Sequence, residues 1–124
     1  MNMKMVIAVR KDLNMRRGKS EGQVGHAVQE AILDRSDPDN PKLKTTPDIL
    51  AWLASDFRKI VVSVKDEAEL MELYRQTLQR GWNHYLVTDK GHTEFHGVPT
   101  FTTLAIGPLP EDVIDELTGE MPLR

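Results

Sequence analysis

Residues 3–32 read MKMVIAVRKDLNMRRGKSEGQVGHAVQEAI, and this stretch decides the fold. Residues 4–10 are mostly apolar and end in β-branched side chains, which predicts a buried strand. In residues 19–34 apolar side chains recur every three or four positions, which predicts an amphipathic helix with Gly18 or Ser20 as its N-cap. The polar residues between the two segments form a loop. A strand followed by a loop and a helix predicts an α/β domain.

The rest of the chain continues this alternation. Further strands are expected at 59–64, 84–88 and about 102–106, and further helices from about Pro47 with Thr46 as cap, over 66–80 with Gly81 as its stop, and over 111–117. Residues 36–46 are expected to be loose, and the Gly107–Pro110 segment is expected to be a turn. The pattern predicts one domain over residues 1–124, with helices packed on a central sheet. Because the last two strands lie close in sequence, they form an antiparallel pair and the sheet is mixed.

The composition is that of an ordinary globular protein. The chain has 124 residues, a net charge of −3 and no cysteine, so disulfides, thiolate nucleophiles and cysteine-based metal sites are excluded. No apolar run is long enough to span a bilayer, and the first residues lack the pattern of a signal peptide. We therefore expect a cytoplasmic protein that does not bind membranes.

The first candidate site is the basic turn Arg16-Arg17-Gly18-Lys19-Ser20 between the first strand and the first helix. Helix N-termini and the carboxyl ends of strands favour anionic ligands in α/β proteins. The spacing differs from that of a P-loop. The turn would suit a phosphate or a developing oxyanion, although the charges alone favour a solvated basic loop.

The helix that follows carries three polar side chains on one face. Lys19, Gln23 and His26 are spaced to lie together, away from the apolar stripe. Gly22 and Gly25 are costly in a helix. They predict a close approach of a ligand or of another backbone, or tight packing of the helix on the sheet.

The second candidate site is the segment Asp89-Lys90-Gly91-His92-Thr93-Glu94-Phe95-His96. Asp89 ends a predicted strand, where catalytic carboxylates are common. His92, Glu94 and His96 could together bind a metal ion. The glycines make a continuous helix here unfavourable, so the preferred prediction is that the protein has no metal site.

Together these segments resemble the peptidyl-tRNA hydrolases of the archaeal and eukaryotic type. The similarity rests on three groups of residues in order: Arg10, Asp12-Leu13, Gly18-Lys19, Gln23 and His26; then Asp89, Gly91 and Thr93; then Thr102, Leu104, Ile106-Gly107-Pro108, Thr118-Gly119 and Leu123. It covers most of the chain except residues 34–57. Around Gly91 the sequence differs from the family pattern, and Arg17 replaces a usual lysine.

The resemblance implies a three-layer α/β/α fold with a mixed four-stranded sheet, commonly a homodimer. It implies hydrolysis of the ester between a peptide and the 3′-terminal ribose of tRNA, without a metal or organic cofactor. Carried over by position, the catalytic candidates are Lys19, His26, Asp89, Thr93 and Thr102. Cations and a histidine near them, Arg16, Arg17, Lys90 and His92, are the candidates for tRNA binding.

The residue types suit this chemistry. Ester hydrolysis needs an activated water, a stabilised oxyanion and a protonated leaving oxygen. We expect Asp89, with His26, to position or activate the water, and Lys19 to stabilise the oxyanion or the terminal phosphate. Thr93 and Thr102 would orient the ester or the water. Other functions that fit the same residues are an RNA- or protein-binding module without activity, a hydrolase of another small ester or amide, and the metalloenzyme.

Overall fold

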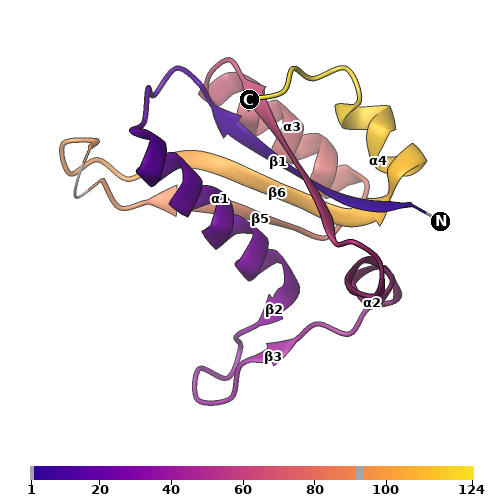
Figure 1. Ribbon diagram of the computed structural model, residues 1–124. Coiled ribbons are helices and arrows are strands. Elements are labelled where there is room, and N and C mark those ends of the chain that lie inside the picture. Colours follow the sequence, from indigo (N-terminus) through magenta and orange to yellow (C-terminus); the bar gives the residue numbers. More distant parts are fainter. Residues whose placement is uncertain (1, 92–93) are drawn as a thin grey trace.

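The computed structural model describes residues 2–91 and 94–124. It shows a central sheet with helices on both faces (Figure 1). In chain order the elements are β1 (Met3–Arg10), α1 (Arg17–Ile32), β2 (Leu33–Asp34), β3 (Lys42–Leu43), α2 (Pro47–Ala54), β4 (Arg58–Val64), α3 (Glu67–Gln79), β5 (His84–Asp89), β6 (Thr100–Pro110) and α4 (Glu111–Thr118). None of the described helices has the length and hydrophobicity required to cross a membrane.

The main sheet has the strand order β4-β1-β6-β5. β1 pairs in parallel with β4 and antiparallel with β6. β5 pairs antiparallel with β6, as the short connection between them predicts. The prediction of a mixed four-stranded sheet is confirmed.

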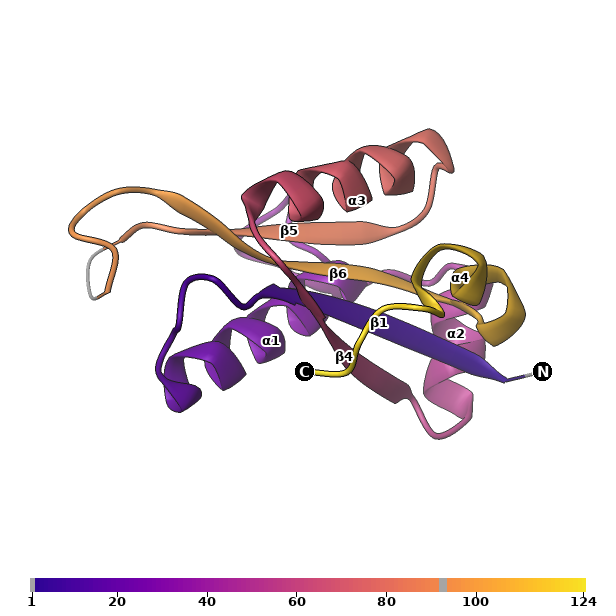
Figure 2. The same ribbon diagram turned by 90° about the horizontal axis from the view of Figure 1, so that it is seen from above.

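β1 is an inner strand of the sheet, and its side chains pack into the core on both faces of the sheet. All of its residues are buried, which is the pattern of a strand covered on two sides. One face packs against α1 and α2 through the cluster Met5, Ile7, Val9, Ala27 and Trp52. The other face packs against α3 and α4 through the cluster Val6, Ala8, Leu70, Leu73 and Ile114. Figure 2 shows α1 and α3 on opposite sides of the sheet. The three-layer α/β/α arrangement is confirmed.

The ends of α2 and α3 follow local capping chemistry. The Thr46 side chain accepts a hydrogen bond from the Ile49 N–H, so the predicted cap of α2 is confirmed. Asp66 caps α3 in the same way, through the Glu69 N–H. Gly81 follows α3 with a φ of +67°, a left-handed conformation that glycine adopts without strain.

The predicted start of α1 and the predicted loose segment were wrong in part. α1 begins at Arg17, with Arg16 at the N-cap position and no side-chain cap, so neither Gly18 nor Ser20 caps it. Residues 36–46 are not entirely loose, because β3 pairs with β2 in a small antiparallel ladder. Two-residue strands are too short to leave an alternating pattern in a sequence.

The predicted turn at Gly107–Pro110 was also wrong. These residues continue β6 to Pro110, and they pair beside the start of β1. A cis peptide bond joins Gly107 to Pro108. Glycine and proline usually signal a turn, but here the burial of the strand against β1 overrides that local preference.

The core predicts a contrast between two leucines of α3. Leu70 is fully buried and Leu78 is 49% exposed. We expect Leu70→Ala to lower the free energy of unfolding by about 2–5 kcal/mol, because the substitution leaves a cavity in the core. The control Leu78→Ala should cost less than about 1 kcal/mol. Urea denaturation measures both, and equal losses would contradict the assignment of the core.

Candidate active site

A hollow of about 400 Å³ lies between α1 and the carboxyl end of β5. The α1 side contributes Lys19, Gly22, Gln23 and His26, and the β5 side contributes Val87, Thr88, Asp89 and Lys90. The predicted polar face of α1 is thereby confirmed to line one cavity. The two segments singled out in the sequence, 70 residues apart, meet here because α1 packs across β5 and β6.

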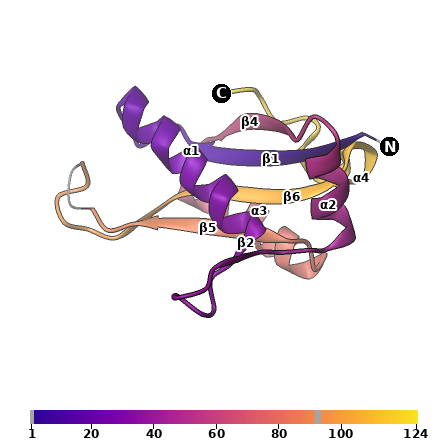
Figure 3. The ribbon, with the colours of Figure 1, turned by 60° about the horizontal axis from the view of Figure 1, so that its bottom comes forward.

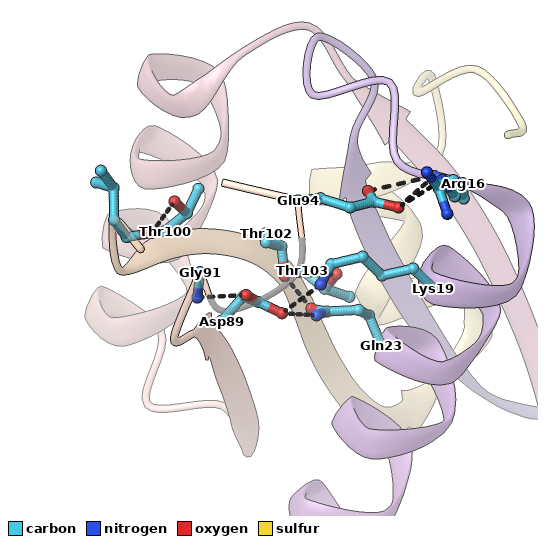
Figure 4. Close-up of polar contacts among 10 residues, drawn as sticks. Arg16, Lys19, Gln23, Asp89, Gly91, Glu94, Thr100, Thr102 and Thr103 are labelled. Carbon is cyan, nitrogen blue, oxygen red and sulfur yellow. Dashed lines mark hydrogen bonds and ion pairs between the residues drawn. The ribbon is translucent and has the colours of Figure 1, made fainter. Parts of the chain in front are cut away.

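Asp89 is the centre of the polar contacts in the hollow (Figure 4). Its Oδ2 lies 3.1 Å from Lys19 Nζ and accepts a hydrogen bond of 2.6 Å from Gln23 Nε2. Its Oδ1 accepts a hydrogen bond of 2.6 Å from the Gly91 N–H. The side chains of Lys19 and Asp89 are only 16% and 14% exposed, so this ion pair is screened by water far less than a surface pair.

The orientation of Gln23 is fixed by a row of hydroxyl groups from β6. The Thr102 hydroxyl donates to Gln23 Oε1, and the Thr103 hydroxyl donates to the Thr102 oxygen at 3.2 Å. Both threonines are fully buried. Because the carbonyl of Gln23 receives the Thr102 hydroxyl, its amide nitrogen must face Asp89.

The surroundings of Asp89 keep its carboxylate charged. Burial alone would raise the pKa of Asp89, but the hydrogen bond from Gly91, the cation of Lys19 and the hydrogen bond from Gln23 together outweigh it. The pKa of Asp89 is therefore lowered below its ordinary value. At neutral pH the site holds a carboxylate paired with an ammonium group.

The turn after β5 depends on a glycine. Gly91 has a φ of +82°, and a Cβ at this position would lie 2.3 Å from the Val98 carbonyl oxygen. The Gly97 N–H closes the same loop by donating to the Gly91 carbonyl at 2.7 Å. Only glycine allows the chain to pass this close to itself and still present its N–H to Asp89.

Two residues of this loop contact the start of α1. Phe95 packs with its ring centre 5.2 Å from Lys19 Nζ, an arrangement in which the ring face attracts the cation. Glu94 Oε1 lies 3.6 Å from Arg16 Nε, and its carboxylate faces the Arg16 N–H. The loop therefore covers Lys19 and partly neutralises Arg16.

The other predicted cations are open to solvent. The side chains of Arg16 and Arg17 are 90% and 93% exposed, and Arg17 forms an ion pair of 2.9 Å with Glu21 one turn along α1. Lys90 is exposed at the rim of the hollow. Of these three cations, Lys90 lines the hollow, while Arg16 and Arg17 lie at the start of α1.

His26 lies in the same hollow without a hydrogen bond to Asp89. Its ring packs in a T-shaped arrangement with the Tyr85 ring, with 5.9 Å between the ring centres. His26 is exposed, so water and a substrate can reach it.

Two predicted site residues, His92 and Thr93, lie outside the described residues. The metal site considered for His92, Glu94 and His96 therefore falls partly outside as well. Within residues 2–91 and 94–124, no cluster of three or more histidine, aspartate or glutamate side chains is arranged to hold a metal ion.

The predicted close approach of another backbone at Gly22 and Gly25 was wrong, and so was the alternative of tight packing on the sheet. A Cβ at either position would meet no atom within 4 Å. The close approach of a ligand stays a prediction. Gly22 instead widens the hollow, where a side chain would project into the cavity.

No chemical role was predicted from the sequence for Gln23, Thr103, Phe95 or the backbone of Gly91. Gln23 was within reach, since it follows Lys19 by one helical turn. The positions of Thr103 and Phe95 depend on how β6 and the loop fold back on α1, which no local pattern shows.

Comparisons with known proteins find relatives over almost the whole chain. The sequence profile of the family described as Peptidyl-tRNA hydrolase PTH2 matches residues 3–124. Peptidyl-tRNA hydrolase of Methanocaldococcus jannaschii is 38% identical over 121 residues, which cover 98% of this chain and 99% of that protein. The Methanopyrus kandleri protein of the same name is 40% identical, with 97% of each chain covered. The Methanothermobacter thermautotrophicus protein is 38% identical over 98% of this chain and 99% of its own.

The buried ion pair predicts how Asp89 titrates. In Lys19→Met the pKa of Asp89 should rise, because burial is then opposed only by the hydrogen bonds from Gly91 and Gln23. Carboxyl-carbon NMR over a pH series measures this value, and Lys65→Met, at an exposed position after β4, serves as control.

The same shift has a consequence for stability. A lowered pKa means that Asp89 stabilises the fold above the pKa of the unfolded chain, about 3.9, and that this contribution is lost as the pH falls through the lower folded value. An Asp89 pKa unchanged by Lys19→Met would contradict the ion pair.

Proposed function

This chain belongs to the family of peptidyl-tRNA hydrolases named PTH2, and we propose how its residues carry out the reaction. The protein is a hydrolase that cleaves the ester bond between a peptide, or an N-blocked amino acid, and the 3′-terminal ribose of tRNA. The observation that carries the mechanism is the Asp89 carboxylate, held ionised in the hollow by Lys19, Gln23 and Gly91.

Ester hydrolysis has three chemical requirements. A water molecule must be aimed at the carbonyl carbon, the negative charge on the carbonyl oxygen must be stabilised, and the ribose oxygen must take up a proton as it leaves. Groups already fixed in place lower the barrier more than groups that must reorganise. The hollow offers such fixed groups at its floor.

Asp89 would hold and polarise the attacking water. Its Oδ1 accepts one hydrogen bond, from the Gly91 N–H, and so keeps a lone pair for water, whereas Oδ2 already faces Lys19 and Gln23. Because its pKa is lowered, it acts as a weak base, and its main contribution is to orient the water and to stabilise the positive charge that develops on it. Lys19, beside it, would stabilise the oxyanion or the terminal phosphate.

Thr102 would act through Gln23. Its buried hydroxyl reaches Gln23 and not the hollow, so Thr102 is a positioning residue that sets the direction of the amide. His26, at the open side of the hollow, would exchange protons with the attacking water or the leaving ribose oxygen. Thr93 is proposed from the resemblance alone, as a group that orients the ester.

The exposed cations would bind the tRNA backbone. Arg16 and Arg17 are exposed cations at the start of α1, and Lys90 is an exposed cation at the rim of the hollow. His92 is added from its position in the sequence alone. Phosphates next to the terminal ribose would meet these side chains once the ester is at Asp89. We further propose, from the resemblance, that residues 1–124 act as one domain, that the protein works as a homodimer, and that it acts in the cytoplasm.

The first test of this mechanism is deacylation of N-acetylaminoacyl-tRNA. We expect Asp89→Asn to lower kcat/KM by about 100-fold or more, because the amide loses the negative charge that orients water and pairs with Lys19. Lys19→Ala should lower it by about 100- to 1000-fold. Asp56→Asn, at an exposed position before β4, is the matched control. Near-normal rates in both site variants would overturn the assignment.

The second test concerns salt. Binding of tRNA should weaken linearly on a plot of log affinity against log salt concentration, and Arg17→Ala should reduce the slope by about one. Arg75→Ala is the control, because Arg75 also pairs with an acid on its own helix but lies on α3. Fluorescence anisotropy with labelled tRNA measures the slopes. A slope that Arg17→Ala leaves unchanged would remove Arg17 from the interface.

A further inference from the structure

The two outer strands of the sheet differ in whether another segment of the chain covers their outer edge. The edge of β4 is covered by the last residues: the Ser63 N–H donates to the Pro122 carbonyl at 2.9 Å, and the Arg124 N–H donates to the Val61 carbonyl at 3.0 Å. β5 is the other outer strand. No described residue forms a backbone hydrogen bond to its outer side.

The register shows which backbone groups of β5 are free. The Gly107 N–H donates to the Asn83 carbonyl at 2.8 Å, so Asn83 faces β6. In an antiparallel ladder, alternate residues turn their backbone groups to the partner. The irregularity between Val87 and Thr88 adds a residue to β6 and not to β5, so the alternation along β5 continues. His84, Leu86 and Thr88 therefore turn their N–H and C=O groups outward.

This open edge leads into the active-site hollow. Val87, Thr88 and Asp89 line the hollow and belong to β5. In Figure 3, β5 forms the lower margin of the sheet, with β6 above it and α1 crossing the face. A chain that leaves the hollow along β5 meets unpaired backbone groups within one or two residues of Asp89.

We propose that the peptide part of peptidyl-tRNA binds as an added strand along the outer edge of β5, and this inference rests on the proposed function. The ester is at the carboxyl end of the peptide and reacts beside Asp89, which is at the carboxyl end of β5. The peptide therefore runs in the same direction as β5 and pairs with it in parallel.

Strand addition suits a substrate of variable sequence. Main-chain hydrogen bonds provide affinity in this mode, and side chains only modulate it. Extended peptide and strand residues rise by about 3.3 Å each, so the stretch from Asp89 back to His84 matches about five peptide residues. Residues beyond these would add little.

The test compares substrates of increasing length on one tRNA: N-acetylaminoacyl, dipeptidyl, tripeptidyl, pentapeptidyl and octapeptidyl. We expect kcat/KM to rise by about fivefold for each added hydrogen-bonded residue and to level off after about five residues. N-methylation of single peptide amides in the tripeptidyl substrate should lower kcat/KM at alternate positions only. Equal values at all lengths, or equal effects of methylation at all positions, would overturn the proposal.

A pair of enzyme variants tests the edge itself. Thr88→Pro removes an outward N–H at a place where an edge strand tolerates proline, and Thr88→Val keeps it. Thr88→Pro should lower the tripeptidyl to N-acetylaminoacyl ratio of kcat/KM to about one, whereas Thr88→Val should retain the wild-type ratio. A retained ratio in a folded Thr88→Pro protein contradicts the proposal. If that variant does not fold, the methylated substrates decide.

Two further outcomes separate the hypotheses. If the wild-type protein turns over none of these substrates, the proposed function is overturned, and this inference with it. Turnover independent of length, together with dimerisation that Thr88→Pro abolishes in sedimentation, would show that the edge binds a second copy of the chain and not the peptide.

Discussion

The burial of β1 on both faces is the constraint on which the rest of the structure depends. Every residue of this strand is buried, so helices must cover the sheet on two sides. α1 and α2 supply one cover, and α3 and α4 supply the other. The chain leaves β1 at Arg10, whose guanidinium is held by Asp12 and by the Phe101 carbonyl. That anchor directs the loop toward α1 and places Lys19 over the end of β5.

The candidate active site is a consequence of this packing. Lys19 and Gln23 come from α1, Asp89 comes from β5, and Thr102 comes from β6. A buried carboxylate is costly unless charges and hydrogen bonds compensate it. Here Lys19, Gln23 and Gly91 provide that compensation, so the site and the packing of α1 on the sheet stabilise each other. Removing one partner would leave a charge in a mostly buried position.

The two edges of the sheet differ, because one is covered by the chain and the other is open beside the candidate site. An exposed edge strand invites pairing with other chains, and proteins usually cover or disrupt it. β4 is covered by residues 122–124, whereas β5 ends at Asp89 with its outer groups free of described backbone partners. An enzyme whose substrate carries a peptide of any sequence has a use for such an edge, because backbone groups are the only feature that all peptides share.

The sequence by itself determined the α/β class, the main elements, the polar face of α1 and the carboxylate at the end of β5. These features follow from local periodicity, capping and the position of residues at strand ends, all of which depend on neighbours in the chain. The family resemblance, with the comparisons, established the reaction. Only the tertiary structure decided that Gln23 and Thr102 orient each other, that Gly107 and Pro108 extend β6, and that Gly22 and Gly25 have open space beside them. The physical reason is that each of these depends on contacts between segments far apart in the chain, where the cost of an unsatisfied buried group or a void outweighs the local preference of a residue.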